Sequence, residues 1–336
     1  MIYLYGNRLL LAVILLFCFN QLHTYQKLSM MMNNQPTNWQ AIKHHLLESL
    51  RLELWIVQPT CDSLAVSGNK QLKLKYHINK AQQEHKAGIL TFGGAFSNHL
   101  LATAVSCAEN AIPCIGMVRT DQLDPVNPTL NACQQAGMQL IALSRAQYKQ
   151  RNEPAWLARL QQDYPSTLIV PEGGTSSYGV KGVSEFDVGT TPSGKADVLI
   201  TATGSGGTLA GLSLGHPNCQ ALGIAVVKDT TLSEKIATLS QQQTNWHLLS
   251  DFVGKGYGRF DDSLLQFCLD FKKDTTISLE PIYTGKAMRA VFTLISQHYF
   301  RPRSKLVFFH TGGLQGLAGL LYRGLISQQE YDLLMA

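Results

Sequence analysis

The sequence contains few charged residues. Asp, Glu, Lys and Arg make up 15% of the 336 residues, against roughly 25% in an average globular protein, whereas apolar residues make up 45%. The 28 Lys and Arg exceed the 23 Asp and Glu by only five, and they form no basic run. This composition excludes a largely disordered or coiled-coil chain. It also argues against a nucleic-acid partner, which needs a concentrated basic surface.

Cysteine pairs are missing as well. The seven cysteines are an odd number, and none forms a C-x-x-C pair. This pattern argues against a disulfide framework or a structural zinc site. No H-E-x-x-H pattern or comparable cluster indicates a catalytic metal. Isolated thiols are typical of buried cysteines in a reducing compartment, so the expected location is the cytoplasm.

The apolar run near the N-terminus is too short to cross a bilayer, which takes about 20 residues. This run, Leu9 to Phe19, has eleven residues and follows Arg8. It resembles the apolar core of a signal peptide, but no small-residue cleavage site follows it. A signal or membrane anchor, a structured segment, and an extension upstream of a start at Met30–Met32 all stay open. We expect residues 1–31 to be a leader outside the fold, so that a chain starting at Met32 would fold and bind its ligand.

Short apolar strands then alternate with amphipathic helices. Residues 38–50 and 73–86 are expected to form helices, with a strand at 52–57 between them. Further strands are expected at 88–92, 114–118, 139–143, 168–170, 197–202, 221–227 and 306–309, and further helices at 98–110, 128–136, 153–162, 233–241, 262–271 and 287–299. Such alternation indicates right-handed βαβ units and buried parallel sheets. The expected class is α/β, with parallel-rich sheets flanked by helices.

Glycines concentrate where these strands should end, at 93–94, 173–174, 204–207 and 312–313. Ligands of open α/β sheets bind outside the carboxyl ends of strands, and glycine lets the backbone approach a ligand closely. The segment Ile200 to Gly211 (ITATGSGGTLAG) shows a strand, a glycine-rich turn and the start of a helix. Free N–H groups at that helix start would hold a phosphate. A tight turn without a ligand is the alternative.

Several common motifs are excluded here. The dinucleotide pattern G-x-G-x-x-G fails because Leu209 stands at the position of its last glycine. The nearest P-loop match, residues 189–195, is followed by Ala196 where Ser or Thr is required. A G-x-S-x-G pattern around Ser213 falls inside an expected helix, not on a strand-to-helix elbow. A small cofactor that carries a phosphate remains.

Six short segments occur in a specific order. They are SGNK (67–70), GGAFSNH (93–99), PEGGT (171–175), GSGGT (204–208), YTGK (283–286) and HTGG (310–313). Together they resemble the pyridoxal-phosphate enzymes of fold type II, and most of all the D-cysteine desulfhydrase and 1-aminocyclopropane-1-carboxylate deaminase family. The resemblance covers about residues 52–320. It implies the cofactor pyridoxal 5'-phosphate and a tryptophan synthase β-like, two-domain fold.

The resemblance also implies a domain division and an assembly. A large cofactor-binding domain would span residues 35–71 and 173–336, and a small mobile domain would span 72–172. A homodimer that acts on a small amino acid, with no nucleic-acid partner and no membrane contact of the catalytic body, is expected.

By this resemblance Lys70 carries the cofactor, through an amine that bonds to the cofactor aldehyde and then acts as a base at the substrate Cα. Its spacing of 27 residues from Ser97 is that of the family. Lys73 and Lys75 are competing candidates, which we expect on the helix that follows. The alternative is that Lys70 is an ordinary surface lysine without a function.

Ser97, Asn98 and His99 should begin a helix, where N–H groups and the helix dipole stabilise a substrate carboxylate. The resemblance implies that Asn98 contacts the ring oxygen of the cofactor, and that Ser97 and His99 address the substrate. A simple N-cap for Ser97 and a packing role for His99 stay open.

The remaining expected contacts come from three other segments. The cofactor phosphate is expected on the backbone amides of Gly204, Ser205, Gly206, Gly207 and Thr208, and on the Thr208 hydroxyl. Thr311 resembles the hydroxyl that meets the pyridine nitrogen, and Thr284 stands where the deaminases place a group facing that nitrogen. Tyr257 and Tyr283 resemble a pair of active-site tyrosines that stack on the cofactor or move protons, with buried core tyrosines as the alternative.

Two positions favour the desulfhydrase branch, because Thr284 stands where the deaminases carry Glu and His99 where they carry Gln. One segment departs from the family: Arg-Asp-Asp usually precedes the lysine, and residues 57–62 read VQPTCD here. The expected reaction is an α,β-elimination that converts D-cysteine to pyruvate, sulfide and ammonia. Deamination of aminocyclopropane carboxylate, another reaction such as racemisation, and cofactor binding without turnover are the alternatives.

Overall fold

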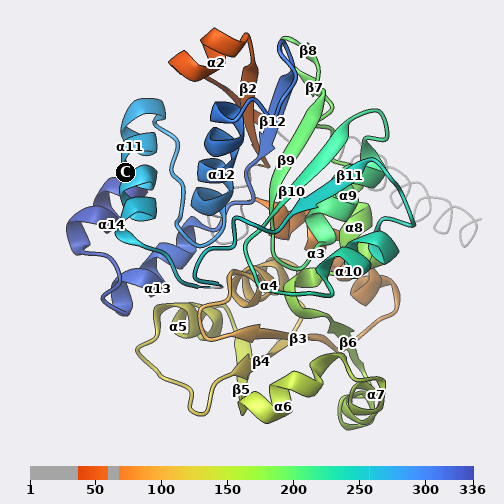
Figure 1. Ribbon diagram of the computed structural model, residues 1–336. Helices are drawn as coiled ribbons and strands as arrows, with labels where there is room; N and C mark the ends of the chain where they lie inside the picture. The colour runs from red at the N-terminus through yellow and green to blue at the C-terminus, as the bar shows by residue number, and fades with distance from the viewer. Residues whose placement is uncertain (1–36, 60–67, 257) are drawn as a thin grey trace, which may run out of the picture. The chain divides into compact units, whose positions relative to one another are not determined.

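The computed structural model describes residues 37–59, 68–256 and 258–336 (Figure 1). The expected leader over residues 1–31, part of the segment 57–62, and Tyr257 lie outside the described residues. In the part of the chain that is described, no helix is both long enough and apolar enough to span a bilayer.

The larger of the two main sheets has six strands in the order β1-β2-β12-β9-β10-β11. In that order the strands span Thr37–Ile42, Glu53–Pro59, Lys305–Phe309, Val198–Thr203, Gln220–Ala225 and Trp246–Leu249. From β2 to β11 every neighbouring pair is parallel. The carboxyl ends of these five strands therefore meet at one edge of the sheet.

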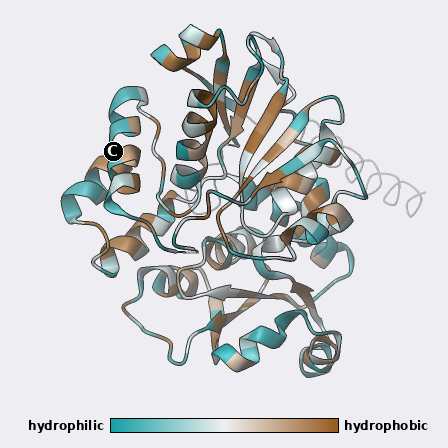
Figure 2. Ribbon diagram, viewed as in Figure 1, coloured by the Kyte–Doolittle hydropathy of each residue, from teal (hydrophilic) through white to brown (hydrophobic). Residues whose placement is uncertain are grey.

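Both faces of this sheet are covered by helices. Side chains alternate between two cores along the central strands, so that Phe308 of β12 faces one core and Phe309 faces the other. Helices α11 (Asp262–Thr275), α12 (Thr284–Ser296) and α14 (Gln328–Met335) pack on the first side, and α8 (Ser177–Ser184), α9 (Gly207–Gly215) and α10 (Leu232–Leu239) pack on the second (Figures 1 and 2). Burial on both faces explains why the strands read as continuous apolar runs.

The smaller sheet has four strands in the order β5-β4-β3-β6, and all of its pairs are parallel. In that order they span Met138–Leu143, Cys114–Arg119, Gly88–Gly94 and Thr167–Val170. Helices α3 (Asn69–Gln83), α4 (Asn98–Glu109) and α5 (Pro128–Gln135) share one core with this sheet, and α6 (Arg145–Lys149) and α7 (Pro154–Asp163) share another. The expected α/β class with parallel-rich sheets is confirmed, and the division into a large and a small domain stays a prediction.

The remaining elements are short. They are α2 (His45–Leu50), α13 (Leu317–Tyr322), the hairpin strands β7 (Thr190–Thr191) and β8 (Gly194–Lys195), and three 3-10 helices at Gln150–Asn152 (η1), Glu172–Gly174 (η2) and Leu314–Gly316 (η3).

The expected helix over residues 38–50 is wrong in its first half. Residues 37–42 form the edge strand β1, and only His45–Leu50 are helical. Trp39 packs edge-on against Trp55 of β2, with ring centroids 6.4 Å apart. This contact between neighbouring strands outweighs the local helical periodicity. Strand β11 at the opposite edge was not expected either, because its sequence WHLL is short.

Candidate active site

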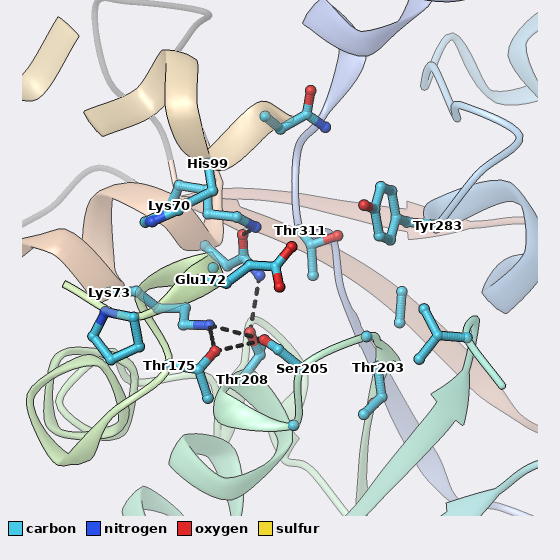
Figure 3. Close-up of a pocket in the computed structure, with 18 of the residues that line it drawn as sticks. Lys70, Lys73, His99, Glu172, Thr175, Thr203, Ser205, Thr208, Tyr283 and Thr311 are labelled. Carbon is cyan, nitrogen blue, oxygen red and sulfur yellow. Dashed lines mark hydrogen bonds between the residues drawn. The ribbon is translucent and has the colours of Figure 1, made fainter. Parts of the chain in front are cut away.

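A cavity of about 780 Å³ opens where strands of both sheets end. Its lining includes segments at or after the carboxyl ends of β3, β4, β6, β9, β10 and β12, the start of α3, and residues of α10. The fold class places ligands at such strand ends, and the volume is typical of sites for small ligands. Ten of the predicted site residues line the cavity: Lys70, Ser97, Asn98, His99, Gly204, Ser205, Gly206, Thr208, Tyr283 and Thr311 (Figure 3).

The glycine-rich turn after β9 leads directly into helix α9. Gly206 is the N-cap residue and has a φ of 86°, in the left-handed region that favours glycine. A Cβ at this position would lie 2.8 Å from Cγ1 of Ile236, so the turn also lacks the space for a side chain. No side chain caps the helix. The first N–H groups of α9 are therefore available to an anion.

Lys73 approaches the same turn from helix α3. Its side chain is 2% exposed, and its Nζ donates hydrogen bonds to the hydroxyls of Thr175 (2.7 Å) and Ser205 (3.4 Å) (Figure 3). Burial, and then the nearby Lys70, hold the pKa of Lys73 well below its ordinary value. Among the described residues, no carboxylate forms an ion pair with Lys73. An amine held near a helix N-terminus without a counter-ion suits a phosphate ligand.

Lys70 lies one helical turn before Lys73 and faces the cavity. Its Nζ donates a hydrogen bond of 2.8 Å to Oδ1 of Asn69, and Nδ2 of Asn69 donates one of 2.9 Å to the Thr208 hydroxyl. Burial lowers the pKa of Lys70 to about 8, although the Glu280 carboxylate opposes the shift. At pH 7 about a tenth of Lys70 is therefore the neutral, nucleophilic amine, whereas an ordinary lysine with a pKa of about 10.4 is almost wholly protonated.

The position of Lys70 depends on Gly68. This residue has a φ of 94°, and a Cβ on it would lie 2.4 Å from the backbone oxygen of Thr311. The backbones of Gly68 and Gly312 form an antiparallel bridge. Only glycine allows this approach, which fixes the start of α3 against the segment that follows β12.

Helix α4 begins at the cavity, as predicted for residues 97–99. Ser97 is its N-cap, and the Ser97 hydroxyl accepts a hydrogen bond from the Leu100 N–H at 3.3 Å. Ser97 also lines the cavity, so the N-cap role and a role toward a ligand coexist at this residue. Nδ2 of Asn98 donates a weak hydrogen bond to the carbonyl oxygen of Gly313 at 3.4 Å.

His99 is 3% exposed, and its hydrogen bonds fix which ring nitrogen carries the proton. The Thr91 hydroxyl donates its single proton to the Val170 carbonyl at 2.8 Å, so it must accept from Nε2–H of His99, also at 2.8 Å. Burial and the two lysines hold the pKa of His99 well below its ordinary value. Nδ1 is then an acceptor that is buried without a hydrogen-bond partner among the described residues. A donor on a bound ligand would satisfy it.

Thr311 and Tyr283 line the cavity, but Thr284 does not. Thr284 is fully buried, and its N–H and hydroxyl donate to Oε1 of Glu280 at 2.7 and 3.0 Å. Glu280 also accepts from the N–H of Ile282 at 2.8 Å, and burial raises its pKa to about 7. Glu280 thus caps the start of α12, and Thr284 is engaged in that cap. Gly207 does not line the cavity, and a Cβ on it would be 3.1 Å from Nζ of Lys73.

Two contacts were not predicted from the sequence, that of Lys73 with the hydroxyls beside the glycine turn and that of Glu280 with Thr284. The signal for Lys73 was present, because residues three apart on a helix share a face and Lys70 was already assigned to the site. Lys75 points elsewhere and forms a surface ion pair of 2.9 Å with Glu185. Ser213 is not a nucleophile at an elbow, since its buried hydroxyl donates to Asn245 from within α9.

Comparison with known proteins agrees with this geometry. The family model described as "Pyridoxal-phosphate dependent enzyme" matches residues 46–312. A D-cysteine desulfhydrase of Salmonella choleraesuis (strain SC-B67) is 27% identical over 301 residues, covering 81% of this chain and 90% of the relative. One of Salmonella newport (strain SL254) is 26% identical over 300 residues, with the same coverage.

Solved structures show the same fold. An ACC deaminase homologue superimposes with a TM-score of 0.74 at 23% identity, covering 90% of this chain and 95% of that structure. A serine racemase from Dictyostelium discoideum gives a TM-score of 0.57 at 13% identity, covering 85% and 96%. The family match over most of the chain and the cavity with its lysines and glycine turn lead to one conclusion: the chain belongs to the pyridoxal-phosphate dependent enzymes.

Proposed function

We propose that this enzyme is a lyase that removes the β-substituent of a small amino acid, as a D-cysteine desulfhydrase does. D-Cysteine and water would give pyruvate, ammonia and hydrogen sulfide. The observation that carries the proposal is the lowered pKa of Lys70, next to an anion site formed by α9 and Lys73. The similarity to the two Salmonella desulfhydrases supports the choice of substrate.

The residues present suit pyridoxal 5'-phosphate. Lys70 would bind the aldehyde, and the phosphate would lie on the N-terminus of α9 with the Thr208 hydroxyl and Lys73 beside it. Asn98 and Thr311 line the same cavity and would address the ring, Asn98 at the ring oxygen and Thr311 at the pyridine nitrogen. When bound, the cofactor withdraws electrons from the substrate Cα and makes its proton acidic.

The side chains of the cavity would perform the proton transfers and the binding. The neutral amine of Lys70 would take the proton from Cα, because a pKa of about 8 makes that form far more accessible than in an ordinary lysine while leaving the amine basic enough to accept the proton. The N–H groups at the start of α4 would bind the substrate carboxylate. The hydroxyl of Ser97, the Nδ1 acceptor of His99 and the phenol of Tyr283 line the remaining space around the substrate. Tyr257 stays a prediction for the same role.

The position of Thr284 favours the desulfhydrase reaction over the deaminase reaction. Its hydroxyl bonds to Glu280 and does not line the cavity, so Thr311 is left as the proposed partner of the ring nitrogen. A neutral hydroxyl there suits elimination, since the departing group takes the electrons. We further propose a small mobile domain at residues 72–172, a homodimer, and a location in the cytoplasm.

The test is turnover of D- and L-cysteine by the purified protein, with sulfide and pyruvate measured together. We expect the D-enantiomer to react faster. Lys70→Ala should lose both turnover and the absorbance of the lysine-bound cofactor, whereas the surface variant Lys75→Ala should keep both. Formation of 2-oxobutyrate from aminocyclopropane carboxylate without sulfide release from D-cysteine would contradict the proposal, and so would a lysine-bound cofactor in Lys70→Ala.

A further inference from the structure

Arg119 brings a positive charge to the wall of the cavity where the substrate is proposed to bind. It is the last residue of β4 and pairs in register with Gly94, the last residue of β3. Its Nη2 atom lies 3.5 Å from the place where a Cβ on Gly94 would stand. The Ser97 N–H donates to the Gly94 carbonyl at 3.0 Å, so Arg119 borders the turn that begins α4. The guanidinium is therefore next to the proposed site of the substrate carboxylate.

The charges on this wall do not cancel. Arg151 also lines the cavity, and its Nε donates to Oε2 of Glu172 at 2.6 Å, so these two charges compensate each other. Figure 3 shows the Glu172 carboxylate among the side chains drawn in the cavity. Arg119 is exposed at the mouth of the cavity and forms no ion pair with any carboxylate of the described residues. One positive charge on this wall is thus left for a ligand.

The Arg119 side chain also lies over an aromatic ring. Its guanidinium carbon lies 5.6 Å from the ring centroid of Tyr148, and that of Arg151 lies 4.7 Å from the same centroid. Tyr148 is 2% exposed and belongs to the core beneath α6 and α7. A contact with a fixed ring restricts the guanidinium before a ligand binds, which favours specific recognition of an anion.

A substrate such as cysteine has a single carboxylate, and the N–H groups of α4 would take it. The remaining cation then calls for a second acidic group. We propose that Arg119 selects amino acids whose β-substituent ends in an anionic group. The inference rests on the proposed function and gives its substrate class: β-substituted alanines with a thiol leaving group that carries a carboxylate.

S-Carboxymethylcysteine is a suitable probe of this class. Elimination would break the Cα–H bond and the Cβ–S bond, and the electron pair of the Cβ–S bond would leave with sulfur as the thiolate of thioglycolate. Addition of one water to the three-carbon product gives pyruvate and ammonia, so no oxidant or reductant is needed. S-Carbamoylmethylcysteine has nearly the same shape but is neutral at the end of its side chain.

The experiment compares kcat/KM for these two probes, as D- and L-enantiomers, in the wild-type holoenzyme and in Arg119→Gln. We expect the wild type to prefer the charged probe by about tenfold or more, as charge-assisted hydrogen bonds generally allow. Arg119→Gln should lose that preference and keep its rate on the neutral probe. Arg119→Lys should restore part of the preference, and the exposed Arg145→Gln, away from the cavity, should change neither rate.

Binding gives a readout that needs no turnover. Succinate and its monoamide, succinamate, titrated into the holoenzyme by calorimetry, should differ in affinity in the wild type and not in Arg119→Gln. An equal loss of kcat/KM on both cysteine probes in Arg119→Gln would overturn the inference, because Arg119 would then bind the α-carboxylate that the two probes share. Turnover of cysteine with no preference for the charged probe would also overturn it while leaving the proposed function intact. Arg119-dependent binding of succinate without turnover of any cysteine derivative would support the anion site and reject the lyase activity.

Discussion

Lys70 and Lys73 lie on one face of α3, and their partners differ in kind. Lys70 donates to the amide oxygen of Asn69, which itself donates to Thr208, so the reactive amine and the phosphate-binding turn are joined through one side chain. Lys73 donates only to hydroxyls. Burial favours the neutral form of both amines, and an anion would favour the charged form of Lys73. The cofactor phosphate would therefore set which of the two lysines is protonated.

Replacing Lys73 with Met should weaken cofactor binding without preventing attachment to Lys70. Loss of one charge-assisted contact to the phosphate corresponds to a dissociation constant about 10- to 100-fold higher. Equilibrium dialysis of pyridoxal 5'-phosphate against wild type, Lys73→Met and the surface control Lys75→Met measures this. An unchanged dissociation constant in Lys73→Met would remove Lys73 from the phosphate site.

The pKa of Lys70 predicts the pH dependence of cofactor attachment. Only the neutral amine attacks the aldehyde, so a group with a pKa of about 8 gives a rate that rises with pH and levels off above that value. A free lysine amine, with a pKa of about 10.4, would keep gaining about tenfold per pH unit through this range. The measurement is the rate of absorbance change when cofactor is added to the cofactor-free protein between pH 6.5 and 9.5. A rate that still rises tenfold per unit at the upper end would show that burial does not lower this pKa.

At the scale of elements, the site depends on helices that begin where parallel strands end. Helix α9 follows β9 through a glycine turn without a capping side chain, whereas α4 follows β3 with Ser97 as its cap. The first arrangement leaves N–H groups for a phosphate, and the second partly satisfies them. This difference agrees with the roles proposed for the two helices, since a phosphate needs more donors than a substrate carboxylate.

Gly206→Ala should therefore destabilise the protein and weaken the phosphate site together. An alanine with a positive φ costs about 1–2 kcal/mol, and the short approach to Ile236 adds to this cost. Gly254→Ala is a matched control, because Gly254 also has a positive φ of 62° but has no atom within 4 Å of an added Cβ. In urea unfolding, the free energy of unfolding should fall by about 1 kcal/mol more for Gly206→Ala than for the control. Equal losses of unfolding free energy in Gly206→Ala and Gly254→Ala would mean that the turn at Gly206 relaxes without strain.

At the scale of the whole molecule, the features that could be predicted from the sequence are those that a local sequence pattern determines. Apolar strands alternating with helices gave the α/β class, and glycines at strand ends gave most of the cavity lining. Three features depend on specific side-chain contacts and were missed, and two of these contacts join residues far apart in the chain. The contact of Trp39 with Trp55 turns an amphipathic segment into β1, Glu280 removes Thr284 from the cavity wall, and Lys73 meets Thr175 more than a hundred positions away. Local periodicity carries no information on such partners.

The place of β12 has a consequence for how the protein is made. Among the described residues it is the last strand in chain order, yet it lies between β2 and β9 in the larger sheet, and the backbone after it closes on Gly68. The sheet therefore stays open, with β2 unpaired on one side, until β12 has been synthesised. The turn that carries Lys70 gains its support only at that moment. We therefore expect cofactor binding only once β12 is part of the chain, and until then the unpaired edges of β2 and β9 are sites for aggregation.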